Sequence, residues 1–430
     1  MKKVFFSIII AIAFIGIFVG HQPVRANTVG FDCSTVTDVS QEDCEALLTF
    51  YESTTGSGWT HQDNWLSSTK VNDWYGVTAA CGNVNALELS ENNLVGLIPP
   101  DLEHLINLSI LRLDHNQLIG GIPQSLGNLT YLKRLILNHN QLNGSIPDSL
   151  GNLSNINDIF LDHNELTGSI PESLGNLSHL QTLYLNKNQL NGEIPTSLGN
   201  LSILRDLRLD LNYLSGSIPE SLGNLINLQH LNLCYNQLSG SIPDSLGNLS
   251  NLRSLSLYHN HLGGKIPESL GNLSNLTHLY LNTNQLCASI PESLGNLSRL
   301  VLLNLNENQL YNAIPDSLGN LNKLVFLSLQ NNRLSGSIPD SLGNLINLKL
   351  LRLQNNQLSG DIPLSFTNLV NLCVPGQNNC SYYGLNLDYN FLNTPTPEPL
   401  ASFLAIKAPD WHLSQRTTVF FDVPETHWAY

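Results

Sequence analysis

The chain has 430 residues, of which only 12% are charged, and a formal net charge of −15 at pH 7. This acidic balance argues against nucleic acid or an anionic membrane surface as the main partner. The length allows two or three ordinary domains or one long repeat array, and the internal periodicity described below favours the array.

The first residues are typical of an export signal. Two lysines precede an apolar run over residues 4–19, and the triplet Val24-Arg25-Ala26 follows. This pattern predicts a signal peptide over residues 1–26. A short membrane anchor is the alternative, but the run is slightly short to span a bilayer. We therefore expect the mature chain to be secreted or held at the cell surface, with no transmembrane segment after cleavage.

Residues 27–83 precede the repeats and are expected to form an N-terminal cap, because the end coil of a solenoid would otherwise expose its core. The segment from Ser40 to Asp43 resembles a helix capping box. Cys33 and Cys44 are predicted to form a disulfide, since an exported chain can keep such bonds oxidised. Trp59, Trp65 and Trp74 are expected in the core of this cap rather than on a sugar-binding surface.

Residues 84–372 contain twelve units with a period of 24 residues. Asparagine recurs without a slip from Asn92 to Asn356, with a leucine three residues before and two residues after each one. The unit is L-x-x-L-x-L-x-x-N-x-L-x-G-x-I-P-x-x-L-G-N-L-x-x. This pattern resembles the leucine-rich repeat family, in particular its 24-residue plant-type (LxGxIP) subclass, here of the bacterial exported kind. The resemblance implies an α/β fold: a right-handed solenoid with a parallel concave β-sheet and short convex helical turns, capped at both ends.

Each part of the unit also has a physical role. The alternation L-x-L predicts a strand with inward-facing leucines. The asparagine amide is expected to turn inward and satisfy backbone groups at the bend. The glycine four residues later suits a positive φ, and the proline is expected to open a short helical turn. In eight units Asp or Glu follows that proline. This acidic row could collect Ca²⁺, but it is better explained by the dipole of the helical turn.

Residues 373–415 are expected to form a degenerate thirteenth repeat and a C-terminal cap. A second disulfide is predicted between Cys373 and Cys380, which leaves Cys81, Cys234 and Cys287 without an assigned partner. The stretch LASFLAIKAPDW is expected to form a short closing helix, and the arrangement resembles bacterial exported repeat proteins more than plant receptors. Residues 416–430 end in F-x-D-V-P-x-x-H-W-A-Y, which resembles the start of a surface-layer homology module, a class that binds cell-wall polymers.

The variable positions indicate where a partner could bind. Positions six, four, two and one residues before each repeat asparagine change from coil to coil and are expected to face out from the concave sheet. The column six before includes Asp158, Asp206, His230 and His278. The other three columns contribute the candidate ligand-binding residues of the concave face: Arg112, Asp114, His115, Ile136, His139, Phe160, Asp162, His163, Tyr184, Lys187, Arg208, Asp210, Tyr235, Tyr258, His259 and Tyr280.

These residues predict binding and no catalysis. The aromatic and arginine side chains match the composition of protein-interface hot spots. His115, His139 and His163 could offer imidazoles to Zn²⁺, but side chains in a parallel row are expected to diverge, so neither a metal nor a cofactor is predicted. The chain has no G-x-S-x-G, H-E-x-x-H or phosphate-binding loop, and we predict no enzymatic activity.

The sequence therefore predicts a secreted or cell-surface protein that uses its concave face for protein–protein recognition, with a protein or peptide as ligand. One alternative is a structural cell-envelope adhesin whose regular flanks make the contacts. The other is a surface that binds cell-wall glycan or ice. A repetitive surface such as a polysaccharide calls for a repeated motif, whereas the mixed concave residues favour a protein.

Overall fold

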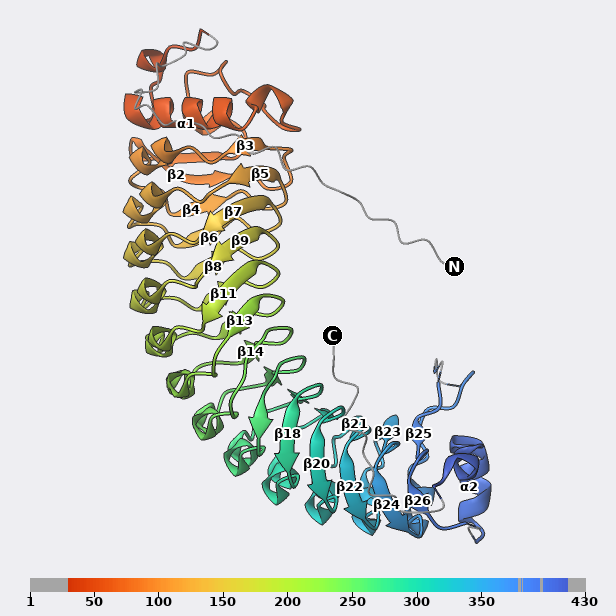
Figure 1. Ribbon diagram of the computed structural model, residues 1–430. Helices are drawn as coiled ribbons and strands as arrows, with labels where there is room; N and C mark the ends of the chain where they lie inside the picture. Colours follow the sequence, from red (N-terminus) through yellow and green to blue (C-terminus); the bar gives the residue numbers. More distant parts are fainter. Residues whose placement is uncertain (1–29, 378–379, 381, 395–396, 417–430) are drawn as a thin grey trace, which may run out of the picture.

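The computed structural model describes residues 30–377, 380, 382–394 and 397–416. The predicted signal peptide over residues 1–26 and the tail beyond residue 416 lie outside this part of the chain. Within it, no helix is both long and apolar enough to span a membrane. The coils stack into a long arc, with helix α1 (Gln41–Ser53) at one end and helix α2 (Leu400–Lys407) at the other (Figure 1).

The inner side of the arc is a single 14-stranded sheet, in the order β1-β2-β4-β6-β8-β10-β12-β14-β15-β17-β19-β21-β23-β25. The pair β1 and β2 is antiparallel, and the pairs from β2 onward are parallel and in register, coil upon coil. Its strands are β1 (Val77–Ala80), β2 (Asn83–Glu88), β4 (Ile110–Arg112), β6 (Arg134–Ile136), β8 (Asp158–Phe160), β10 (Thr182–Tyr184), β12 (Asp206–Arg208), β14 (His230–Asn232), β15 (Ser254–Ser256), β17 (His278–Tyr280), β19 (Leu302–Asn304), β21 (Phe326–Ser328), β23 (Leu350–Arg352) and β25 (Leu385–Asn386).

Two shorter parallel sheets of six strands each lie along one flank. The first comprises β3 (Val95–Leu97), β5 (Gln117–Gly120), β7 (Gln141–Ser145), β9 (Glu165–Gly168), β11 (Gln189–Glu193) and β13 (Tyr213–Ser215). The second comprises β16 (Gly263–Gly264), β18 (Gln285–Ala288), β20 (Gln309–Asn312), β22 (Arg333–Gly336), β24 (Gln357–Gly360) and β26 (Phe391–Leu392). Isolated bridges at Ser217–Ser239 and Ser241–Gly263 span the gap between them.

The outer side of the arc consists of short 3₁₀ helices, one per coil (Figure 1). Each begins directly after the repeat proline, which is its N-cap residue, as Pro99 is for η4 and Pro123 is for η5. The helices are η4 (Pro100–His104), η5 (Gln124–Asn128), η6 (Asp148–Asn152), η7 (Glu172–Asn176), η8 (Thr196–Asn200), η9 (Glu220–Asn224), η10 (Asp244–Asn248), η11 (Glu268–Asn272), η12 (Glu292–Asn296), η13 (Asp316–Asn320), η14 (Asp340–Asn344) and η15 (Leu364–Asn368).

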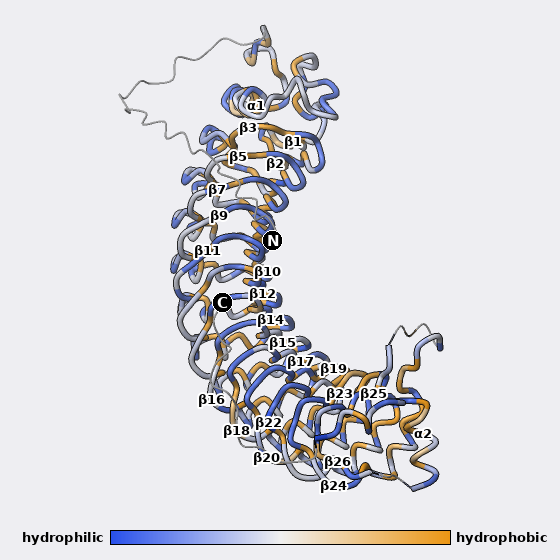
Figure 2. The backbone as a smooth tube through the Cα atoms, turned by 45° about the vertical axis from the view of Figure 1, so that its right-hand side comes forward, coloured by the Kyte–Doolittle hydropathy of each residue, from blue (hydrophilic) through white to orange (hydrophobic). Residues whose placement is uncertain are grey.

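The core is one continuous column of buried leucine and isoleucine side chains between these layers. In Figure 2 hydrophobic and hydrophilic stretches alternate along the coils of the solenoid. Each coil buries its apolar side chains only against its neighbours, so the stability of the stack depends on the interface between each coil and the next. The predicted fold, a capped leucine-rich repeat solenoid, is confirmed.

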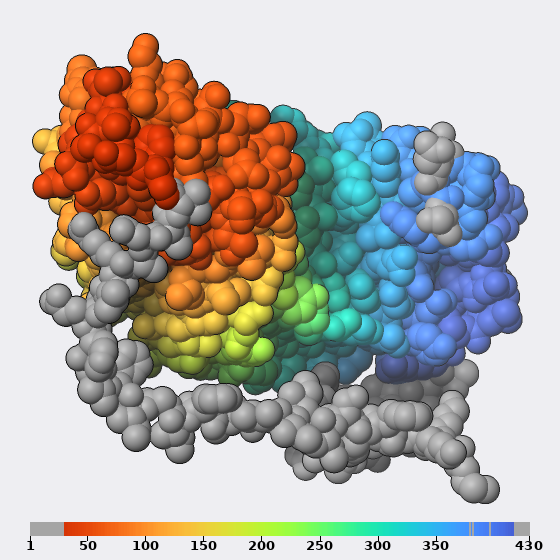
Figure 3. Space-filling view, turned by 90° about the horizontal axis from the view of Figure 1, so that it is seen from above, coloured from red at the N-terminus to blue at the C-terminus, as the bar shows by residue number. Residues whose placement is uncertain are grey.

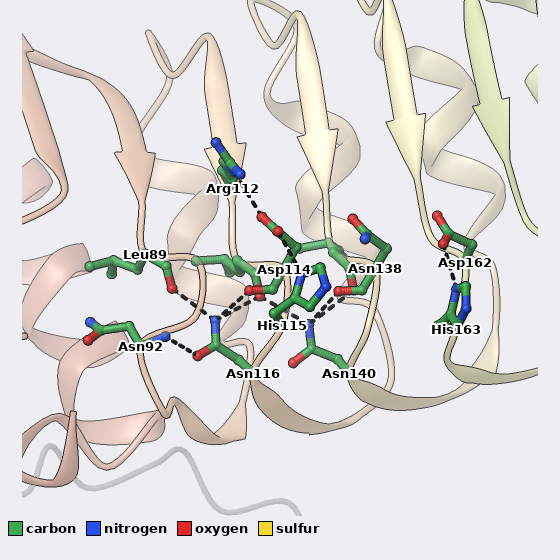
Figure 4. Close-up of polar contacts among 12 residues, drawn as sticks. Leu89, Asn92, Arg112, Asp114, His115, Asn116, Asn138, Asn140, Asp162 and His163 are labelled. Atoms are coloured by element: carbon green, nitrogen blue, oxygen red, sulfur yellow. Dashed lines mark hydrogen bonds and ion pairs between the residues drawn. The ribbon is translucent and has the colours of Figure 1, made fainter. Parts of the chain in front are cut away.

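The repeat asparagines join neighbouring coils, as expected from the sequence. The amide Nδ2 of Asn116 donates to the carbonyls of Leu89 and Leu113 at 2.9 Å, and its Oδ1 accepts the N–H of Leu94 at 2.9 Å (Figure 4). The same set of bonds recurs along the stack. The glycine position also behaves as expected: φ is positive at Gly120, and it stays positive at Ala288 and Asn312, where glycine is replaced.

The N-terminal cap combines α1 with η1 (Cys33–Thr35), η2 (Gly56–Gly58) and η3 (Val71–Asp73). Ser40 Oγ accepts the N–H of Asp43 at 3.0 Å and so caps α1. Trp59, Trp65 and Trp74 are buried and in mutual ring contact, which confirms them as cap core. Seen from above, this cap covers the first coils (Figure 3).

The C-terminal end is closed by a thirteenth coil, α2 and η16 (Trp411–Ser414). The amide of Asn390 donates to the carbonyls of Leu353 and Leu387, which continues the asparagine series although Asn390 follows Asn356 by 34 residues instead of 24. Disulfides join Cys33 to Cys44 and Cys373 to Cys380, the two pairs expected from the sequence. Cys81, Cys234 and Cys287 are free thiols.

Candidate functional site

The concave strands set equivalent side chains beside one another. Parallel pairing in register aligns Phe160 with Tyr184 and Tyr184 with Arg208 on strands β8, β10 and β12. Residues four before each repeat asparagine therefore form a row across the sheet, with the leucines on either side turned into the core. The side chains of this row are the ones that a ligand on the concave face can reach.

Phe160, Tyr184, Asp206 and Arg208 form one connected group, which we call the tyrosine–arginine cluster. The rings of Phe160 and Tyr184 meet edge to face at 4.9 Å between centroids. The guanidinium carbon of Arg208 lies 4.4 Å from the centroid of the Tyr184 ring. Asp206 joins both partners: its Oδ2 accepts the Tyr184 hydroxyl at 3.0 Å, and its Oδ1 accepts Arg208 Nε at 3.1 Å. These contacts hold the aromatic and cationic side chains in fixed positions while leaving them partly exposed.

The protonation state of Tyr184 fixes the direction of its hydrogen bond to Asp206. Burial, and then the adjacent Asp206 carboxylate, raise the pKa of Tyr184 to about 12. The phenol is therefore neutral at physiological pH and remains a donor to Asp206. The cluster therefore presents an aromatic edge, a neutral phenol and a guanidinium on the concave face.

Further along the sheet, Tyr235, Tyr258, His259 and Tyr280 form a second group, the tyrosine cluster. Tyr235 stacks on His259 at 4.3 Å and meets Tyr258 edge to face at 5.3 Å between centroids. Tyr258 in turn lies 5.9 Å from Tyr280. Burial raises the pKa of Tyr258 and of Tyr280, so both hydroxyls stay protonated at physiological pH.

His115, His139 and His163 form a third group, the histidine row, in the turns that follow strands β4, β6 and β8. Neighbouring rings are stacked, with centroids 4.2 Å apart between His115 and His139 and 3.8 Å apart between His139 and His163. Asp114 Oδ2 lies 2.9 Å from His115 Nδ1, and Asp162 Oδ2 lies 2.7 Å from His163 Nδ1 (Figure 4). Burial, and then the flanking histidines, lower the pKa of His139.

Several predicted residues are less accessible than the sequence suggested. Asp114, Asp162 and Asp210 are buried, with 5%, 7% and 8% of their surface exposed, and Ile136 is buried at 7%. Turns of successive coils are joined by backbone bonds, such as His139 N–H to the Asp162 carbonyl at 3.0 Å, and so cover one another. Although buried, Asp114 helps to position the Arg112 side chain, because it accepts a hydrogen bond from Arg112 Nε at 3.0 Å.

The remaining candidates lie around these groups. Lys187 and Tyr235 are exposed, in the same turn position as the histidine row. That position has a positive φ in every coil from His115 to Asn355, including β-turn residues as bulky as Tyr235 (φ 51°). Arg112 lies four strands away from Arg208 in the sheet, so these two arginines do not act together.

Asp206 belongs to the tyrosine–arginine cluster although it is not among the candidate residues predicted from the sequence. It connects Tyr184 to Arg208, yet it stands six residues before its asparagine, on the far side of an inward leucine. The signal was present in the sequence, since Asp206 and Arg208 are two apart on one strand and two-residue spacing puts side chains on the same face.

These features define a class: a capped repeat solenoid that displays an irregular set of side chains on a regular concave sheet. A sequence model described as Leucine Rich Repeat matches residues 83–105, 107–129, 131–153, 323–345 and 347–369, and one described as a leucine-rich repeat region matches residues 159–286. The chain belongs to the leucine-rich repeat family. A search of curated proteins gave no match.

Solved structures with similar folds come from plants and bacteria. The ectodomain of the plant membrane receptor kinase GASSHO1/SCHENGEN3 from Arabidopsis thaliana, in complex with CASPARIAN STRIP INTEGRITY FACTOR 2, is 35% identical over 83% of this chain, with a TM-score of 0.62. This chain spans only 48% of that ectodomain. The Arabidopsis receptor kinase HAESA, in complex with the peptide hormone IDA and a co-receptor, is 29% identical over 82% of this chain and 70% of its own, with a TM-score of 0.56. A leucine-rich repeat protein of Leptospira interrogans is 30% identical over 75% of this chain and 81% of its own, with a TM-score of 0.55.

Proposed function

We propose that this chain is an extracytoplasmic recognition protein that binds a peptide or an extended protein segment across its concave face. The observation that carries the proposal is the tyrosine–arginine cluster. Aromatic and arginine side chains dominate the binding energy of protein interfaces when they are held in place and partly desolvated. Phe160, Tyr184 and Arg208 meet that description, since their mutual contacts and Asp206 fix their positions before any ligand arrives.

The similar plant ectodomains support the class of ligand, since they are complexes with a peptide hormone and with an integrity factor. The two disulfides support the location outside the cytoplasm, because such bonds persist in oxidising compartments. The row that contains Arg112, Ile136, Phe160, Tyr184 and Arg208 changes character from strand to strand. A peptide with a definite order of side chains fits such a row better than a uniform polysaccharide does.

The test is selection of ligands from a displayed library of random peptides on the purified chain. Enriched peptides are then synthesised and titrated by calorimetry against the chain and against a variant in which Phe160, Tyr184, Tyr258 and Tyr280 are replaced by alanine. We expect binding to weaken at least about 30-fold, the equivalent of losing a single hot spot of about 2 kcal/mol.

The matched control replaces Tyr213 and Tyr311, two exposed tyrosines of the flanking strands β13 and β20, by alanine. This control should bind as the unmodified chain does. Equal binding by the concave-face variant, with an unchanged circular dichroism spectrum, would refute the proposal. A further outcome is that the concave-face variant binds soluble cell-wall glycan fragments and the chain binds no peptide. That outcome would favour glycan recognition or binding by the flanks of the solenoid.

A further inference from the structure

The histidine row holds a set of ligating atoms that the recognition function does not require. His139 lies in the turn after strand β6, and Asp162 and His163 lie in the turn after β8. One ligating atom from each of these three residues lies within 4.8 Å of the others. Figure 4 shows Asp162 and His163 facing one another at this edge of the sheet.

Side chains in a parallel row are expected to diverge from one centre. The backbone of this turn sets how far apart the ligating atoms lie. His139 and His163 both have φ of 54°, a left-handed conformation that the repeat imposes on this position. Both side chains leave the turn in the same direction, and their rings stack at 3.8 Å with an interplanar angle of 21°. The nitrogen lone pairs of stacked rings run nearly parallel, so one ring must turn about its Cβ–Cγ bond before both imidazoles reach the same ion.

The carboxylate of Asp162 is a second observation in favour of a ligand. Its side chain is more than nine-tenths buried, and its Oδ1 makes no hydrogen bond to any described residue. Its Oδ2 faces His163 Nδ1 at 2.7 Å. Equivalent oxygens in other coils, such as Asn186 Oδ1 and Asp210 Oδ1, also lack a partner, so the unpaired oxygen belongs to this position of the repeat. Beside His139 and His163 it supplies a carboxylate oxygen that is free to bind a cation, and such a cation would offset the cost of burying it.

We propose that His139, Asp162 and His163 bind one divalent transition-metal ion of the Zn²⁺ class. Two imidazoles and one carboxylate suit zinc, copper or nickel, whereas Mg²⁺ and Ca²⁺ prefer shells made of oxygen alone. Bonds of about 2.0–2.1 Å in a tetrahedron put ligating atoms roughly 3.3 Å apart, so side-chain rotation must close about an ångström or two of the present separation.

Three protein ligands leave one position of a tetrahedral ion open. His163 has 29% of its side chain exposed, so that position is accessible to water or to a donor from a partner. Phe160 precedes Asp162 by two residues, which puts the metal beside the tyrosine–arginine cluster. The metal site and peptide binding are separate properties, and each can exist without the other.

The experiment is calorimetric titration of the purified chain with ZnCl₂, together with titration by Co²⁺ followed by its visible absorption. We expect one saturable equivalent of Zn²⁺ and a Co²⁺ spectrum with nitrogen and oxygen ligation. H139N, D162N and H163N should each weaken Zn²⁺ binding about 100-fold. Loss of a residue that only supports a ligand costs about 10- to 100-fold, so loss of a direct ligand should reach the upper end of that range.

These variants preserve the fold, because other coils already carry asparagine at the same positions, as at Asn186 and Asn331. The matched controls are D210N and H259N, whose residues occupy equivalent positions without a second histidine beside them. Both should bind Zn²⁺ as the unmodified chain does. The proposal is overturned if the chain does not bind Zn²⁺ or prefers Ca²⁺. It is also overturned if H139N and H163N leave Zn²⁺ binding unchanged, which is the result expected for zinc held by the free thiols.

Discussion

Replacing Asn212 tests whether the asparagine series holds the coils together. Asn212 is buried at 6% exposure, and its Nδ2 donates to the carbonyls of Leu185 and Leu209 at 3.0 and 3.1 Å. Its Oδ1 accepts the N–H of Leu190 at 3.0 Å. Each of the two carbonyls also accepts from the asparagine of a neighbouring coil, Asn188 or Asn236, whereas the Leu190 N–H has Asn212 as its acceptor.

The magnitude follows from this difference. N212A leaves the buried Leu190 N–H without a partner, which costs about 2 kcal/mol, and removes two shared hydrogen bonds worth about 1 kcal/mol each. We therefore expect the free energy of unfolding to fall by about 4 kcal/mol. The control N200A changes an exposed asparagine at the end of η8 and should cost less than about 0.5 kcal/mol.

N212D separates the donor from the acceptor. The new carboxylate still accepts from Leu190 but faces two carbonyls, so burial and repulsion raise its pKa. The folded chain then binds the proton more tightly than the unfolded chain does. The stability of N212D relative to the unmodified chain should consequently recover as the pH falls through that raised pKa.

The assay is urea unfolding followed by circular dichroism, with hydrogen exchange over residues 185–190 as a local measure, because a solenoid can open coil by coil. N212A should accelerate exchange at Leu190, and N212D should affect it less. A loss below about 1 kcal/mol in N212A, or no effect of pH on N212D, would show that these bonds do not hold the coils together.

Three further predictions use other parts of the fold. A Cβ on Gly223 would lie 2.5 Å from the carbonyl oxygen and the Cβ of Ser245, so G223A should lower the free energy of unfolding in urea by about 1–3 kcal/mol. The control G263A, whose Cβ would meet only ordinary van der Waals contacts, should leave it unchanged. Burial, and then His230, lower the pKa of His278, so the unfolded chain binds the proton more tightly than the folded chain does. The free energy of unfolding should therefore fall as the pH drops below about 6.5, and H278N should make it depend less on pH in thermal melts. Burial raises the pKa of the Cys234 thiol to about 11, so iodoacetamide at mildly alkaline pH should modify exposed Cys81 long before Cys234, as read by peptide mass; comparable rates would contradict the buried placement.

Much of the candidate site could be anticipated from the repeat alone. Comparing coils separated invariant core positions from variable ones, and Phe160, Tyr184 and Arg208 fall in one variable column because the period is constant. The sequence could not show that Asp206 joins two of these side chains, since that depends on rotamers and on contacts across strands. It also could not show that Asp162 is buried, because burial there comes from the turn of the adjacent coil.

The sequence by itself determined the coil. A 24-residue period with inward leucines, a turn asparagine and a glycine at positive φ leaves few other ways to satisfy the buried backbone groups, and the spacing of Cys33 and Cys44 matched the bond that forms. Only the tertiary structure decided which variable side chains meet. The left-handed turn at His139 and His163 directs both rings the same way, and parallel register brings Tyr184 onto Arg208. Such contacts arise between residues of different coils, where the direction of a side chain depends on the stacking of its neighbours.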